Sequence, residues 1–113
     1  MCGIAGIVSL NNKPISNVDE RSKKMLNTLK SRGPDHSGYW LNTNKTLSLV
    51  NTRLSIVNIK SKFNVPFVSH SNQSILSFNG EIYNHKNLAK KLQTKGKILK
   101  YNSDTEVLAE GLE

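Results

Sequence analysis

The chain has 113 residues, enough for one domain or part of one, and with 36% hydrophobic content it can bury only a modest core. Its single cysteine excludes an internal disulfide and favours a reducing, cytoplasmic setting, and no apolar stretch approaches the roughly 20 residues that span a membrane. The net charge of +8 is the one feature of a basic nucleic-acid-binding module, but the lysines are scattered among asparagines. A solvated surface explains them better, and we expect no nucleic-acid partner.

The first half of the chain predicts a strand, a helix and then further strands. Residues 3–10 are apolar and β-branched, which favours a buried strand. Ser16 and Asn17 are good N-cap residues, and apolar side chains recur at helical spacing from there until Gly33-Pro34 ends the helix. Residues 38–59 predict two or three strands with a turn at residues 42–45.

The second half predicts a mixture of the same elements. Residues 60–72 show little periodicity and predict a loop, residues 73–80 predict a strand, and residues 84–95 predict a helix. Residues 97–101 predict a short strand, and "SDTE" at 103–106 fits a capping box that starts a third helix. Helices together with strands that hairpins can join predict an α+β fold with antiparallel sheet, without repeats or a domain linker.

Five short segments carry the polar side chains that could do chemistry: "MCGIAGIV" (1–8), "RGPDHSG" (32–38), "RLSIV" (53–57), "NGEIYN" (79–84) and "SDTE". Most are weak signals singly, since Asn-Gly alone marks a turn. Together and in this order they resemble the glutaminase domain of class II glutamine amidotransferases. Within that class, they are most similar to the domain of glutamine-hydrolysing asparagine synthetases.

The resemblance implies a fold and a larger enzyme. The fold is that of an N-terminal-nucleophile hydrolase, a four-layer αββα sandwich of antiparallel sheets with helices outside. The family's domain is longer than this chain, so we expect residues 1–113 to be a partial domain with an incomplete sandwich and no synthetase domain. No "SGGxDS"-type loop occurs, so ATP and magnesium are expected only in that missing domain and no cofactor is expected here.

Cys2 has the role of nucleophile in this resemblance. Removal of Met1 would leave one residue with a thiol and an α-amine, and an α-amine pKa of roughly 7.7–8.0 suits a general base. The thiolate would attack the side-chain amide of glutamine, giving a glutamyl thioester and ammonia. Asn79 and Gly80 would stabilise the oxyanion. The alternatives are a small buried strand residue for Cys2 and a turn between two strands for Asn79-Gly80.

The resemblance assigns the glutamine-binding contacts to seven further residues. Arg53 would grip the α-carboxylate through its planar fork, Asp104 would face the α-ammonium group, and Glu81 would contact the bound amino acid. The backbone that follows Arg53 would line the pocket, through Leu54, Ser55, Ile56 and Val57. The alternatives are a surface ion pair for Arg53, strand core for residues 54–57, and a favourable first-turn acid for Asp104.

Other positions have structural or altered roles. A signature turn is expected to shape the pocket wall, through Arg32, Gly33, Pro34 and Asp35. Asn51 stands where the family usually has histidine, and Val65 stands where it usually has glutamine. No catalytic role or metal site is expected for the histidines, which are His36, His70 and His85.

The partners implied are L-glutamine, a synthetase domain or chain, and a second copy in a homodimer of the complete enzyme; no membrane partner is expected. The leading hypothesis is a glutaminase of the asparagine synthetase type. The alternative is a catalytically inactive fragment, or a subunit of a split protein, that binds glutamine or docks on a partner chain.

Overall fold

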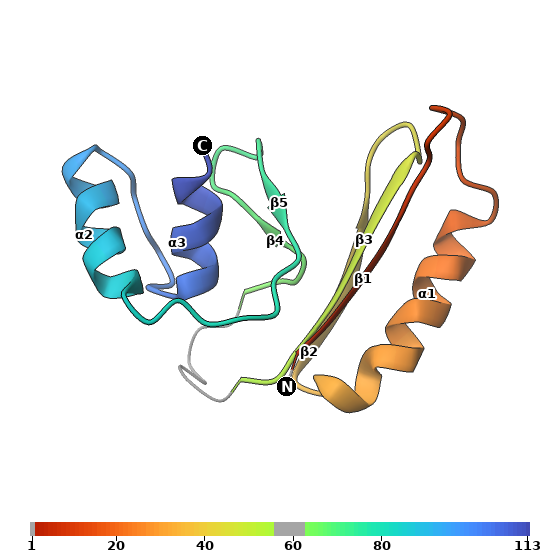
Figure 1. Ribbon diagram of the computed structural model, residues 1–113, viewed down its shortest axis with the longest axis horizontal. Helices are drawn as coiled ribbons and strands as arrows, with labels where there is room; N and C mark the ends of the chain where they lie inside the picture. The colour runs from red at the N-terminus through yellow and green to blue at the C-terminus, as the bar shows by residue number, and fades with distance from the viewer. Residues whose placement is uncertain (1, 56–62) are drawn as a thin grey trace.

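The computed structural model describes residues 2–55 and 63–113, which form two parts lying side by side (Figure 1). The first part is a three-stranded sheet with a helix on one face, and the second is a β-hairpin with two helices. The predicted α+β class with small antiparallel sheets is therefore confirmed. Within the described residues, no helix is both long and apolar enough to cross a membrane.

The first sheet is antiparallel, with strand order β1-β3-β2. Its strands are β1 (Gly3–Val8), β2 (His36–Leu41) and β3 (Leu47–Arg53). Gly3 lies opposite Thr52, and His36 lies opposite Arg53. The starts of β1 and β2 therefore lie at the same end of the sheet as the end of β3. This register brings Cys2, one residue before β1, close to Arg53 in space.

Helix α1 (Val18–Leu29) covers one face of this sheet. Side chains alternate along β3, so Ser48 and Thr52 point toward the helix. The hydroxyl oxygens of Ser22 and Ser48 lie 2.7 Å apart, and the Thr52 hydroxyl donates to the Leu29 carbonyl over 3.2 Å. The opposite face leaves apolar side chains in solvent, with Ile4 50% exposed.

The ends of α1 differ from the expectation. Asn17 adopts a left-handed backbone conformation (φ 50°), and within the described residues its side chain makes no capping hydrogen bond. The predicted side-chain cap at this position is therefore wrong. The α-helix ends at Leu29, and a single 3₁₀ turn, η1 (Lys30–Arg32), follows it directly before Gly33. Asn has one of the lower costs for left-handed geometry, which explains its tolerance here.

The second part is built from short elements. These are β4 (Phe67–Val68), β5 (Ile75–Leu76), α2 (His85–Thr94) and α3 (Asp104–Gly111). Its core is Phe63, Val65, Phe67 and Ala109, with Leu76 and Tyr101 packed against it. The rings of Phe63 and Phe67 meet edge to face, with centroids 5.2 Å apart, an arrangement that aromatic quadrupoles favour.

Three predicted elements were wrong or shorter than expected. Residues 97–101, all described, form no strand; the backbone N–H groups of residues 100–102 instead donate to the Glu106 carboxylate. The predicted loop at 60–72 contains β4, because Phe67 is buried in the aromatic core. The predicted strand at 73–80 is reduced to β5. Residues 38–59 form two strands as far as they are described, with the expected turn at 42–45.

Candidate active site

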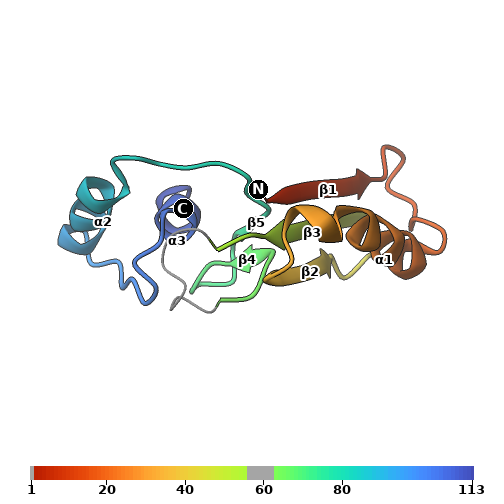
Figure 2. The same cartoon turned by 90° about the horizontal axis from the view of Figure 1, so that it is seen from below.

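A pocket of about 480 Å³ is lined by residues from both parts of the molecule. Figure 2 shows why both contribute: the start of β1 faces the segment that runs from β5 to α2. The pocket brings together most of the predicted site residues that are described. These are Cys2, Arg53, Leu54, Asn79, Gly80, Glu81 and Asp104.

Two side chains hold the backbone around Cys2 by hydrogen bonds to its carbonyl and to that of the next residue. Cys2 is a half-buried free thiol. The Arg32 guanidinium donates from Nε to the Cys2 carbonyl over 3.3 Å, and the Asn51 amide donates to the Gly3 carbonyl over 3.0 Å. Asn51, where the family usually has histidine, thus anchors the residue directly after the thiol. The alternative that Cys2 is a small residue within a strand does not match its place before β1.

Arg53 ends β3 with its guanidinium carbon 4.2 Å from the centroid of the Phe63 ring, a cation–π contact that orients the side chain. The turn at residues 32–35 packs on the Arg53 backbone. A Cβ at Gly33 would lie 2.5 Å from the Arg53 nitrogen, so only glycine permits this approach. The Asp35 carboxylate accepts from the Ser55 N–H over 2.7 Å. The turn at 32–35 thus packs on the backbone of Arg53 and Ser55, but none of its four residues is among the described residues that line the pocket, so a role in shaping the pocket wall stays a prediction.

Of the four residues predicted to line the pocket through their backbone, Leu54 is among the described residues that do so. Ser55 is not among the described residues that line the pocket; its N–H is held by Asp35. Ile56 and Val57 lie outside the described residues.

The segment after β5 supplies the opposite wall. It leads from β5 into α2 rather than into another strand, so a turn between two strands is the wrong interpretation of Asn79-Gly80. A Cβ at Gly80 would lie 2.9 Å from the Phe78 ring. Asn79, Gly80 and Glu81 are exposed. Their polar groups are therefore accessible to a ligand in the pocket.

Asp104 is tied to this same segment at the first turn of α3. One carboxylate oxygen, Oδ2, accepts from the Ile82 N–H over 3.2 Å, and Oδ1 accepts from the Thr105 N–H over 2.8 Å. A carboxylate with two oxygens has about four lone-pair sites, so both oxygens retain acceptor capacity for a ligand.

Several pocket residues were not predicted as site residues. They are Asn51, Phe63, Val65, Phe78, Ile82, Tyr83, His85, Ser103 and Thr105. Asn51 and Val65 had a signal, since both depart from the family pattern. The aromatic residues had none, because an aromatic in a loop is equally compatible with core packing. His85 lies with Nδ1 3.0 Å from the Ile82 carbonyl oxygen, a contact that supports the loop before α2.

The charges around the pocket are mixed. A guanidinium (Arg53) and two carboxylates (Glu81 and Asp104) surround the region that also holds the thiol. Such a set can hold the carboxylate and ammonium groups of one amino acid at once and offer its side chain to a nucleophile. Among the described residues, no group of three or more His, Cys, Asp or Glu side chains is arranged to hold a metal ion.

Comparison with known proteins agrees with this arrangement. Residues 1–113 match the glutamine amidotransferase domain family. The chain is 33% identical over 111 residues to asparagine synthetase [glutamine-hydrolyzing] 1 of Bacillus subtilis, covering 96% of this chain and 17% of that protein. It is 35% identical to the root asparagine synthetase [glutamine-hydrolyzing] of Pisum sativum and 36% identical to a probable asparagine synthetase [glutamine-hydrolyzing] of Schizosaccharomyces pombe. Each of these matches covers 96% of this chain and 18% of the relative.

The chain therefore spans about a sixth of the length of the curated relatives it matches. No solved structure matches it. The family match covers every residue of the chain, and the similarity to the synthetases runs across nearly all of it. On these grounds, the chain belongs to the glutamine amidotransferase domain family, with asparagine synthetases as its relatives.

Proposed function

We propose that this pocket hydrolyses L-glutamine to glutamate and ammonia, as the glutaminase part of an asparagine synthetase. The observation that carries the proposal is the single pocket shared by Cys2, Arg53, Asn79 and Asp104, which come from four separate segments of the chain. Arg53 binds the α-carboxylate, and Asp104 with Glu81 binds the α-ammonium end of the substrate. The side-chain amide then extends toward the thiol.

The reaction uses Cys2 twice. After Met1 is removed, the free α-amine takes the thiol proton, and Sγ forms a bond to the amide carbon of glutamine. Asn79 and the Gly80 N–H stabilise the negative oxygen of the tetrahedral intermediate. Its collapse breaks the C–N bond, and the leaving nitrogen receives a proton and departs as ammonia. Water then attacks the thioester, which releases glutamate and restores the thiol.

We propose further that this pocket works as part of a larger enzyme. The two parts described here belong to a four-layer αββα sandwich of the N-terminal-nucleophile hydrolase type, and residues 1–113 are a partial domain of it. A synthetase domain or chain receives the ammonia, and ATP and magnesium bind there rather than to this chain. That domain uses the ammonia to make asparagine from aspartate. The complete enzyme works as a homodimer in the cytoplasm, where a reducing setting protects a nucleophilic thiol.

The test is to incubate the purified chain with L-glutamine and measure glutamate and ammonia. Mass spectrometry of the same sample records whether Met1 is present. We expect equimolar products from the chain that begins at Cys2 and none from Cys2→Ala. No glutamate above the Cys2→Ala control contradicts the hydrolysis. Glutamine binding by calorimetry without turnover would instead support the inactive glutamine-binding fragment.

A further inference from the structure

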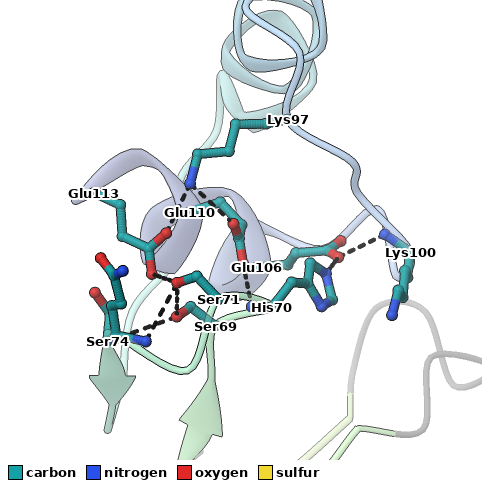
Figure 3. Close-up of polar contacts among 10 residues, drawn as sticks. Ser69, His70, Ser71, Ser74, Lys97, Lys100, Glu106, Glu110 and Glu113 are labelled. Atoms are coloured by element: carbon teal, nitrogen blue, oxygen red, sulfur yellow. Dashed lines mark hydrogen bonds and ion pairs between the residues drawn. The ribbon is translucent and has the colours of Figure 1, made fainter.

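A fully buried carboxylate lies directly behind the candidate substrate-binding wall. Glu106 on α3 is 0% exposed, although glutamate side chains are rarely buried completely. Oε1 accepts from the Lys100 N–H over 2.6 Å and lies 2.7 Å from His70 Nε2, while Oε2 accepts from the Tyr101 and Asn102 N–H groups over 2.8 and 2.9 Å. Figure 3 shows His70 and Lys100 converging on this side chain.

These contacts account for the burial of the charge. A buried carboxylate is costly unless hydrogen bonds replace its water shell, and charge-assisted N–H donors are the strong kind. Because an ionised carboxylate only accepts, His70 presents Nε2 with its hydrogen. Glu106 thereby joins the chain that enters α3 to the hairpin of β4 and β5, where His70 lies.

The contacts also differ from those that the "SDTE" pattern predicts. In a capping box, the third residue of the helix reaches back to the N-cap N–H. Half of that box is present, since the Ser103 hydroxyl accepts from the Glu106 N–H over 3.2 Å. The Glu106 carboxylate instead extends past Ser103 to three earlier residues. It therefore holds a longer stretch of backbone than a capping box would.

Asp104 lies inside this tethered stretch. It follows the three residues whose N–H groups donate to Glu106, and it precedes Glu106 by two positions. Its own carboxylate is set against the opposite wall through the Ile82 N–H. Glu106 itself is not among the described residues that line the pocket, so any effect it has on a ligand must pass through its neighbours.

We propose that Glu106 is a positioning residue: it fixes the backbone on both sides of Asp104, and so makes the pocket selective for ligands with an α-ammonium group. This inference rests on the proposed function for its ligand. The placement of Asp104, by contrast, is measurable in the free protein through the Ile82 amide, which donates to Asp104.

Glu110 offers a matched control one helical turn further along α3. It is 3% exposed, and its carboxylate accepts from the His70 N–H over 2.7 Å and from Lys97 Nζ over 3.3 Å. Glu110→Gln thus alters a second buried acid on the same helix, next to the same hairpin, without touching the bonds to residues 100–102. Both acids are drawn in Figure 3.

The first experiment measures amide hydrogen exchange in the free chain. In Glu106→Gln, we expect the amides of residues 100–102 and of Ile82 to exchange roughly tenfold faster or more, while the amide of Val50 in the central strand of the three-stranded sheet is unchanged. Glu110→Gln leaves the Ile82 amide as it is in the wild type. Where Glu106→Gln does not fold, Glu106→Asp keeps the charge but is too short for all of its partners, and it carries the same expectation. An unchanged Ile82 amide overturns the inference, whether or not the chain binds glutamine.

The second experiment measures selectivity by calorimetry with L-glutamine and with 4-carbamoylbutanoate, which lacks the α-amine. We expect Glu106→Gln to weaken L-glutamine binding roughly tenfold and to change the affinity for 4-carbamoylbutanoate by no more than about twofold. We expect the same pattern for Asp104→Asn. The variant that combines Glu106→Gln with Asp104→Asn should bind L-glutamine no more weakly than Asp104→Asn alone, since both changes act through the Asp104 carboxylate. Equal losses for both ligands overturn the inference. A wild-type chain that binds neither ligand contradicts the proposed function, and the exchange experiment then decides the placement of Asp104 alone.

Discussion

The two parts of the molecule hold their pocket residues in different ways. In the sheet part, Cys2 and Arg53 are placed by strand register, because β1 and β3 are antiparallel neighbours whose ends coincide. In the second part, Asn79 lies on the segment between β5 and α2, and Asp104 is the first residue of α3, where its carboxylate accepts from the Ile82 N–H instead of belonging to a strand ladder. The candidate nucleophile thus depends on backbone pairing, while the opposite wall depends on a few side chains.

This difference has a consequence for mutation. A strand ladder shares its hydrogen bonds over many residues, so a single surface substitution changes little there. The second part concentrates its bonds on Glu106 and Glu110, which are both almost fully buried. Removing one partner from a buried charged contact costs more than the contact contributes on balance, because the other groups are left unpaired.

The largest expected effect tests whether the second part supplies chemistry as well as shape. Asn79→Ala should lower the rate of glutamine hydrolysis by about 10²–10³, the usual cost of losing one oxyanion donor. Steady-state kinetics measures this, with circular dichroism to check the fold. Asn84→Ala is the matched control, because Asn84 ends the same exposed segment and, among the described residues, its side chain makes no capping bond. Equal rates for Asn79→Ala and the wild type would remove Asn79 from the reaction.

A smaller effect is expected where the two parts meet. A Cβ at Gly38 on β2 would lie 2.2 Å from the Val65 carbonyl oxygen, so Gly38→Ala must push the 63–66 segment away. We expect a loss of about 1–3 kcal/mol in the free energy of unfolding, measured by urea denaturation. Gly111→Ala is the control: its Cβ would meet only Leu92 at 3.9 Å, and alanine favours helix. Unfolding midpoints that agree between Gly38→Ala and the wild type would show that the segment moves freely.

The smallest effect concerns an acid on the second part. The Lys97 ammonium, followed by Ser69 and Ser71, lowers the pKa of Glu113 from 4.5 to about 2. A carboxyl with a depressed folded-state pKa contributes stability that is full above its unfolded value and is lost as pH falls through the folded one. The contribution of Glu113 should therefore shrink as pH falls from 4.5 to about 2.

Thermal unfolding of the wild type and of Glu113→Gln across that range measures this contribution. The two melting temperatures should converge at the acid end and differ most above pH 4.5. The effect is small because the Lys97 side chain is 33% exposed, so solvent screens the pair that it forms with Glu113. A difference that stays constant with pH would show that Glu113 acts through packing instead of charge.

Much of the local structure was predictable from the sequence. The helices α1, α2 and α3 follow from apolar spacing, and the hairpin of β2 and β3 follows from β-branched runs around an asparagine-rich turn. The family was predictable as well, because five short segments occur in a fixed order, and the match over residues 1–113 agrees with it. The roles of the individual pocket residues stay predictions.

Other features depended on side-chain contacts that the sequence pattern of the segment does not show. Residues 97–101 predict a short strand, yet the N–H groups of residues 100–102 donate to the Glu106 carboxylate on α3 instead of to a neighbouring strand. Phe67 sits in a stretch without periodicity, yet the aromatic core draws it into β4. In both places, an interaction with a side chain on another element outweighs the local propensity of the segment.

The sequence by itself determined which residues could do chemistry, because residue types and their order along the chain are local information. Only the tertiary structure decided that Cys2, Arg53, Asn79 and Asp104 share one pocket, and that a buried glutamate supports one of its walls. The physical reason is that strand register and burial arise from contacts between segments that are separated by dozens of residues.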